Sequence, residues 1–136
     1  MAKRVDTAYI DKLLDIIKTG VTGYGPCNEQ TACAGEPTDY TSAHTTNKVA
    51  NVTMTGTDFT IGAGASGYAR KLTIGAKTNG GAGYACGSNA TIDHVALTDT
   101  VNSKLIYVTT LASNRAVTTA DFVTFGSWTV EIGTTT

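Results

Sequence analysis

The side chains able to do acid–base or nucleophilic chemistry are few and widely spaced in this sequence. The chain has two histidines, His44 and His94. Asp93 directly precedes His94, but neighbouring side chains of a strand point to opposite faces, so we expect no local base–orienter pair there. The acidic residues are scattered singly, without the pairing that a glycosidase needs. We therefore predict no catalytic residues and a protein that is not an enzyme.

The three cysteines, Cys27, Cys33 and Cys86, are the other candidates for chemistry. Five residues separate Cys27 from Cys33, whereas zinc knuckles place about two to four residues between their cysteines. An odd number of cysteines also argues against a secreted disulfide framework. We predict no metal and no cofactor. Two states stay open for the thiols: all free, or a local bridge between Cys27 and Cys33 that pins a loop.

The sequence gives little support for phosphate binding or nucleic-acid binding. The glycine-rich stretches Gly62–Gly67 and Gly80–Gly87 are each followed by a strand pattern, whereas a phosphate-binding loop leads into a helix. They are expected to be hairpin connections or bulges. The net charge of -1 offers no basic stripe, and Arg70 and Lys71 beside Tyr68 fit the outward face of a strand. We predict no nucleic-acid partner.

One helix is expected near the start of the chain, over Asp6–Lys18. In RVDTAYIDKLLDIIKTG, four apolar residues recur at helical spacing. So short a helix is marginal alone, so it docks either on its own sheet or on a partner. The predicted partner contacts are Ile10, Leu13, Leu14, Ile17 and Tyr24.

Residues 21–46 follow without a periodic pattern and hold both prolines and two of the three cysteines. We predict a long Gly/Pro/Cys loop, either an arm that reaches a neighbouring molecule or an ordered surface loop. We expect a single domain over residues 1–136, with the helix and the arm in residues 1–46 and a β-sandwich in residues 47–136.

From Lys48 onward the hydrophobic pattern changes to the period of strands. The expected strands lie in KVANVTM, DFTIGA, GYARKLTIGAK, TIDHVALTD, KLIYVTTL, DFVTF and SWTVEIG, with breaks at Asp99–Ser103, Ser113–Arg115 and Gly126. Many short strands at near-even spacing predict a mainly β fold, an antiparallel β-sandwich of jelly-roll or Ig-like type with a short N-terminal α-helix.

The structural centre is expected in the half of the chain from Asp93 to Gly133. Leu105, Tyr107 and Val130 alternate with polar neighbours, so we expect them on one buried face. Trp128, the only tryptophan, is expected in the core.

The sequence also bears on location. No stretch is long or apolar enough to span a bilayer, so we predict no membrane association. Asp6, Asp11 and Asp15 interrupt the apolar run that a signal peptide would need. We expect a protein made in the cytoplasm.

Three stretches of the C-terminal third, Asp93–Thr100, Leu105–Thr110 and Trp128–Ile132, resemble small virion proteins of tailed bacteriophages. The resemblance implies a virion structural protein, a capsid decoration or cement protein. Its partners would be the major capsid protein, neighbouring copies of itself, or both, as a homo-oligomer or bound to a lattice. The mechanism would be additive, since a modest interface gains strength when it is repeated over many copies.

A different class of function stays open. A carbohydrate- or receptor-binding β-sandwich module, such as a fibre tip or a lectin-like domain, would place Trp or Tyr at a groove. The expected core position of Trp128 favours the virion scaffold over that alternative.

Overall fold

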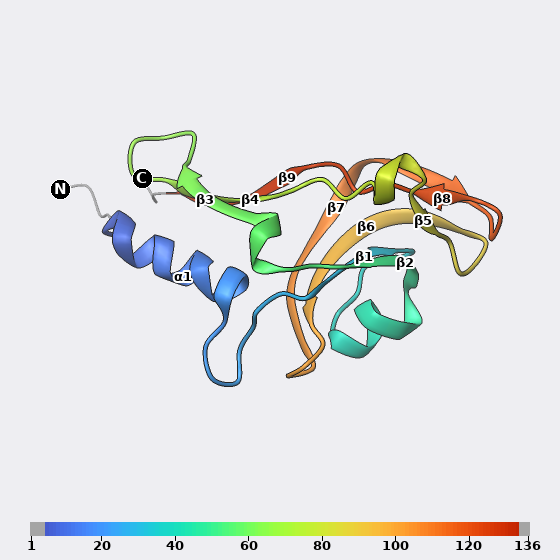
Figure 1. The fold of residues 1–136 in the computed structure, drawn as a ribbon, viewed down its shortest axis with the longest axis horizontal. Helices are drawn as coiled ribbons and strands as arrows, with labels where there is room; N and C mark the ends of the chain where they lie inside the picture. Colours follow the sequence, from blue (N-terminus) through green and yellow to red (C-terminus); the bar gives the residue numbers. More distant parts are fainter. Residues whose placement is uncertain (1–4, 134–136) are drawn as a thin grey trace.

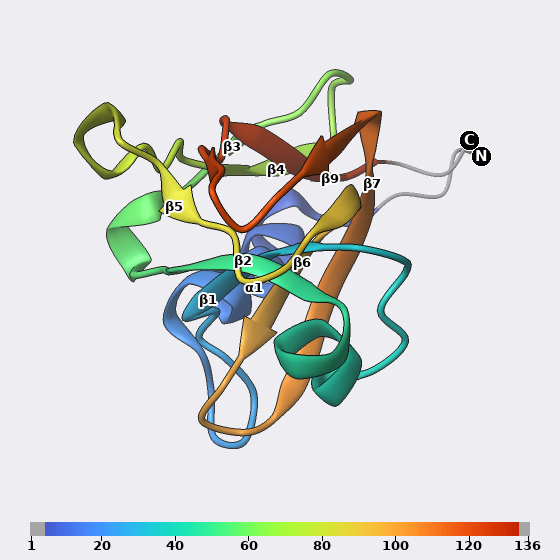
Figure 2. The same ribbon diagram turned by 90° about the vertical axis from the view of Figure 1, so that its right-hand side faces the viewer.

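The structure is a computed structural model that describes residues 5–133, and it is mainly β, with antiparallel sheets and one N-terminal helix, as predicted (Figure 1). In the view of Figure 2, β3, β4 and β9 lie above β1, β2 and β6, and β7 runs along one side of both groups. The short helices η1 (Ser42–Thr46), η2 (Gly56–Asp58) and η3 (Asn79–Gly81) lie in the connections.

The larger sheet has four antiparallel strands in the order β2-β1-β6-β7. Its strands are β2 (Lys48–Thr53), β1 (Glu29–Cys33), β6 (Ala90–Asp99) and β7 (Lys104–Val117). Ala32 of β1 pairs with Ala50 on one side and with Val95 on the other. All five residues of β1 are buried, so β1 is a central strand covered on both faces.

This position of β1 corrects the predicted Gly/Pro/Cys loop. Residues 21–46 contain a buried strand and η1, so the sheet begins at Glu29 and not at residue 47. The physical reason lies in the residue types. Glu29, Gln30 and Thr31 are polar, and a strand covered on both faces shows no alternation of apolar and polar residues. Burying polar side chains in such a strand is costly unless they are hydrogen-bonded, as the Glu29 carboxylate is.

The second sheet has the order β3-β4-β9, from β3 (Phe59–Ala63), β4 (Arg70–Ile74) and β9 (Trp128–Ile132). Leu72 in its central strand pairs with Ile61 and Val130. A two-stranded ribbon joins β5 (Tyr84–Ala85) to β8 (Phe122–Val123). One hydrophobic cluster contains buried residues from the helix and from the strands of all three sheets.

Helix α1 (Thr7–Thr19) packs against its own sheet. Its Ile10 and Leu14 are buried in the main cluster, and Arg70 of β4 donates two hydrogen bonds to Asp11, at 2.6 and 3.0 Å. The helix ends at Gly20, whose φ of 74° is the left-handed region. A Cβ on Gly20 would lie 2.5 Å from the nitrogen of Pro26, so the returning chain requires glycine there.

This docking decides which predicted partner contacts are accessible. Ile10 and Leu14 are buried in the core and Ile17 is partly buried against it, so these three side chains serve the fold. Leu13 and Tyr24 are exposed. The prediction that all five residues meet a partner therefore applies only to those two.

The prediction of one buried face through Leu105, Tyr107 and Val130 is wrong. Val130 is in the main cluster, Leu105 packs against a small second cluster, and Tyr107 is 37% exposed. The pairing of β6 with β7 shifts register between Leu97 and Thr98, which face Tyr107 and Leu105 respectively. The shift leaves Ile106 as an extra residue, and a bulge of this kind places the residues on its two sides on opposite faces.

Candidate functional site

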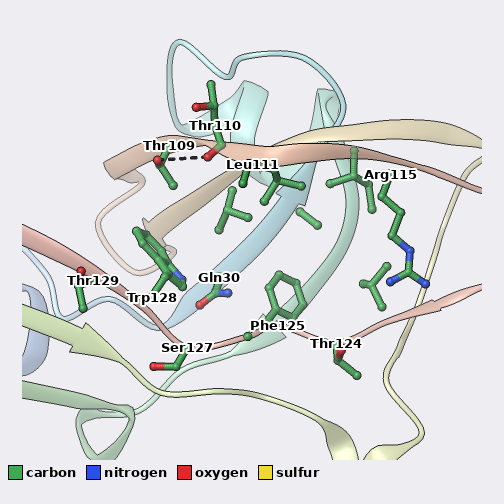
Figure 3. Close-up of a pocket in the computed structure, with 16 residues that line it drawn as sticks. Gln30, Thr109, Thr110, Leu111, Arg115, Thr124, Phe125, Ser127, Trp128 and Thr129 are labelled. Carbon is green, nitrogen blue, oxygen red and sulfur yellow. Dashed lines mark hydrogen bonds between the residues drawn. The ribbon is translucent and has the colours of Figure 1, made fainter.

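A cavity of about 570 Å³ lies between the larger sheet and the chain segment that leads into β9. Strands β1, β6 and β7 line one side of it, and residues 123–129 line the other (Figure 3). The cavity lies where β7 and β9, the edge strands of two different sheets, are not paired with each other.

A bulge in β7 shapes this cavity. Ile92 pairs with Arg115 and His94 pairs with Thr110, so one unpaired position of β6, Asp93, faces four unpaired positions of β7, residues 111–114. The extra residues include Leu111 and Ala112, which line the cavity. The sequence predicted a strand break at Ser113–Arg115; the structure keeps one strand and places an irregularity there. Bulges are frequent beside functional sites because they redirect side chains.

Two buried polar atoms of the cavity lining have no hydrogen-bond partner: Gln30 Oε1, an acceptor, and Trp128 Nε1, a donor. Gln30 is 1% exposed. Figure 3 shows the nitrogen-bearing edge of the Trp128 indole turned toward the Gln30 side chain. Buried polar atoms are nearly always paired, so two unpaired atoms in one cavity are unusual.

Trp128 lies only partly in the core, where the sequence predicted it. The side chain is half-buried, packs against the main cluster, and lies with its ring centroid 6.0 Å from that of Tyr107. The side chain also lines the cavity.

The cavity lining combines apolar side chains with hydroxyl, amide and indole groups. The lining contains no histidine, cysteine or carboxylate. The Ser127 hydroxyl donates to the carbonyl of Ile74 at 2.9 Å. Arg115 is the one charged residue of the lining; it is exposed, and its Nη2 donates a long hydrogen bond of 3.5 Å to the carbonyl of Phe122.

The opposite face of the same sheet carries a second buried polar group, centred on Glu29. The Glu29 carboxylate is hydrogen-bonded to His44 Nδ1 (2.7 Å), Asn51 Nδ2 (2.9 Å) and Thr98 Oγ1 (3.0 Å). Burial alone would raise the pKa of Glu29, but the hydrogen bonds from His44, Thr98 and Asn51 outweigh it and lower that pKa. Tyr40 stacks on His44 with ring centroids 5.0 Å apart. The group anchors η1 to the sheet.

The expectation that Asp93 and His94 form no pair is wrong. His94 Nδ1 lies 2.8 Å from Asp93 Oδ1, and the Gly35 N–H donates to the same oxygen at 2.7 Å. Asp93 falls in the register shift between Ile92 and His94, where the strict alternation of strand side chains is lost. The hydrogen bonds from His94 and from Gly35 lower the pKa of Asp93.

Cys33 pairs in register with His94 but is no candidate nucleophile. It is fully buried, and burial raises the pKa of its thiol to about 12. A thiol is nucleophilic only as the thiolate, so this residue is held in its unreactive form.

All three cysteines are free and buried, which removes the bridge between Cys27 and Cys33. Cys27 packs in the main cluster and Cys33 in the small cluster with Ala43 and Ala96. Cys27 lies before β1 begins, and the two thiols pack in different clusters. Burial also raises the pKa of Cys27 to about 12.

Among residues 5–133 no three His, Cys, Asp or Glu side chains gather as metal ligands would. That the protein binds no metal stays a prediction, which elemental analysis of the purified protein tests. No helix in the described part of the chain has the length and apolar character to cross a membrane.

A separate surface feature lies in the first part of the chain. Nine large hydrophobic side chains are exposed among the described residues, and five of them fall within residues 5–24. These five, Val5, Tyr9, Leu13, Val21 and Tyr24, are called the N-terminal apolar surface below. Tyr9 and Leu13 are four residues apart on the outer side of α1 and are 73% and 56% exposed. Lys104 Nζ lies 5.7 Å from the centre of the Tyr24 ring.

Sequence reasoning identified Leu13, Tyr24 and Trp128 as residues of interest, but not Gln30 or Glu29. Gln30 and Trp128 are almost a hundred positions apart in the chain, and only the fold brings them together. Comparisons with protein-family models, with curated proteins and with solved structures found no match.

Proposed function

We propose that this protein is a non-enzymatic structural component of a phage particle, a capsid decoration protein that binds the major capsid shell in many copies. The N-terminal apolar surface is the observation that carries the proposal. A monomer in water gains nothing by exposing Tyr9 and Leu13, which are neighbours on α1, and exposed apolar side chains that lie together are typical of sites that meet another protein. The resemblance of the C-terminal stretches to small virion proteins supplies the identity of the partner.

The arrangement of α1 suits this role. Ile10 and Leu14 attach one side of the helix to the sheet, and the Arg70–Asp11 ion pair holds its orientation. Tyr9 and Leu13 are thereby presented on a rigid support, which lowers the entropy lost on binding. Many weak copies on a shell then give strong attachment of the layer as a whole.

The finer architecture belongs to the same proposal. The sheets of four and three strands would form the two layers of a β-sandwich. Support comes from the shared main cluster, to which Val52 and Leu97 of one sheet and Leu72 and Val130 of the other belong.

The experiment compares two variants in their binding to particles stripped of this protein. Tyr9→Ser with Leu13→Ser removes exposed apolar side chains from the N-terminal apolar surface, and Phe122→Ser removes one from elsewhere. We expect the double variant to lose at least about tenfold in affinity while Phe122→Ser binds as the unmodified protein does. Deleting the helix would be a poor test, since it would also remove Ile10 and Leu14 from the core. Equal binding of all three proteins, or no binding to particles at all, would contradict the proposal.

The second candidate is a carbohydrate- or receptor-binding module. The observation that favours it is Trp128, whose indole lines a cavity and is not fully enclosed by the core. A glycan array with the purified protein tests it. Binding to a defined glycan, lost in Trp128→Phe, would favour this candidate over the scaffold.

A further inference from the structure

We propose that the cavity between β7 and residues 123–129 binds a small neutral molecule that has an apolar body and one hydroxyl or amide group. The proposal is independent of capsid attachment, because the cavity shares no residue with the N-terminal apolar surface. It rests on the unpaired atoms of Gln30 and Trp128, on the apolar walls, and on the bulge that makes the space.

The two unpaired atoms define the polar group of the ligand. Gln30 Oε1 requires a donor and Trp128 Nε1 requires an acceptor, and the two side chains line the same cavity. A hydroxyl or an amide offers both functions, so one group of the ligand pairs with both side chains. A site built to hydrogen-bond a polar group discriminates strongly against molecules that lack it, because its own buried atoms then stay unpaired.

The remaining walls define the body of the ligand. Ile92, Val95, Leu111 and Phe125 give the cavity aliphatic and aromatic sides, and Ser127 and four threonines add hydroxyl groups. A free sugar would still set several of its hydroxyls against the apolar side chains, which is unfavourable. The volume of about 570 Å³ lies within the range of small-molecule pockets.

The charge of the lining argues for a neutral ligand. Arg115 is the one charged side chain, and it is exposed and directed toward the carbonyl of Phe122. No cation lies beside Gln30 in the lining to pair with a buried anion.

The bulge supplies the room. Leu111 and Ala112 belong to a stretch of β7 that does not pair with β6, and the 123–129 segment is held away by its own bonds, Phe125 with Lys77 and Ser127 with Ile74.

Trp128 makes the test direct, because it is the only tryptophan of the chain and forms part of the cavity wall. Its fluorescence is recorded while cyclohexanol, hexanamide, sodium hexanoate or methyl glucoside is added to the full-length protein. We expect a saturable change with cyclohexanol and with hexanamide, and much weaker binding of hexanoate and of the glucoside.

Three variants assign the binding to the cavity. Gln30→Leu removes the polar atoms at similar volume and is expected to weaken cyclohexanol binding about tenfold. Thr31→Val makes a matched change at the next position of β1, on the opposite face, and should bind as the unmodified protein does. Ala112→Phe, at the exposed bulge, fills the cavity and should abolish binding even where Gln30→Leu fails to fold. A cooperative melt checks the fold of each.

Several results would overturn the proposal. They are the absence of a saturable change with either neutral probe, unaltered binding in folded Gln30→Leu or in Ala112→Phe, and tighter binding of hexanoate or methyl glucoside than of cyclohexanol.

Discussion

Glu29 and Gln30 are neighbours on β1, both are buried, and their surroundings could hardly differ more. Glu29 is 5% exposed and its two oxygens are hydrogen-bonded to His44, Asn51, Thr98 and Thr31. Gln30 is 1% exposed, faces the other side of the sheet, and its Oε1 has no partner. A buried polar group that serves the fold is paired within the fold. The contrast therefore separates a residue kept for stability from one available to a ligand.

The largest expected effect comes from replacing Glu29, the residue of this comparison that is fully hydrogen-bonded. Glu29→Ala leaves the donors of His44, Asn51 and Thr98 without their common acceptor and opens a space beneath η1. We expect a loss of about 3–5 kcal/mol in the free energy of unfolding, measured by urea denaturation. A loss below about 1 kcal/mol would show that the Glu29 group is not what holds η1 on the sheet.

Acid should weaken the same group reversibly. The folded-state pKa of Glu29 is lowered relative to the ordinary value of about 4.3. The stability that Glu29 contributes is thus present above the unfolded pKa and is lost as the pH falls through the folded pKa, at still more acid pH.

The Glu29→Gln variant isolates this contribution from those of the other carboxylates. Its melting temperature should fall less steeply than that of the unmodified protein as the pH is lowered below about 4.3. Parallel pH profiles of the two proteins would rule out a linked proton at Glu29.

A smaller loss of stability is expected at the edge of the sheet face that carries Glu29. Leu105 is half-buried against the small cluster of Cys33, Ala43 and Ala96. Leu105→Ala should therefore lower the free energy of unfolding by about 1 kcal/mol, whereas Leu97→Ala, in the main cluster, should lose about 2–5 kcal/mol. Equal losses would mean that Leu105 is as deeply packed as the sequence predicted.

The thiols should be almost inert, since both faces of the sheet exclude solvent at these positions. Cys27 and Cys33 are buried in different clusters, and burial raises the pKa of each to about 12. In native protein a thiol-reactive dye should label neither at a measurable rate, and all three cysteines should react once the protein is unfolded. Rapid labelling of native Cys33 would show that the sheet face that carries Glu29 and Cys33 opens to solvent.

The sequence predicted the elements whose side chains alternate or recur. Helix α1 follows from Ile10 and Leu14 at helical spacing, and β4 and β9 follow from the alternation around Leu72 and Val130. Strand β1 could not be found in this way, because both of its faces are covered and three of its five residues are polar. Its place in the sheet depends on partners at Thr98 and Asn51, far along the chain.

The candidate site was predictable only in part. Trp128 stood out as the single tryptophan, but its half-buried position depends on the gap between β7 and β9. The break predicted at Ser113–Arg115 coincides in part with the bulge of β7, since small and polar residues are typical of both. Gln30 gave no signal, because a missing hydrogen-bond partner is a property of the fold and not of the residue.

The smallest expected change in stability gives the most direct test of the comparison. The free energy of unfolding of Gln30→Leu is measured by urea denaturation in the absence of any added ligand, beside that of Thr31→Val. Because Gln30 Oε1 has no partner to lose, replacing the amide by an aliphatic side chain of similar volume should leave the stability unchanged or raise it by up to about 1 kcal/mol. A loss of about 2 kcal/mol or more would show that the Gln30 amide makes bonds on which the folded protein depends, and would contradict its assignment to a ligand.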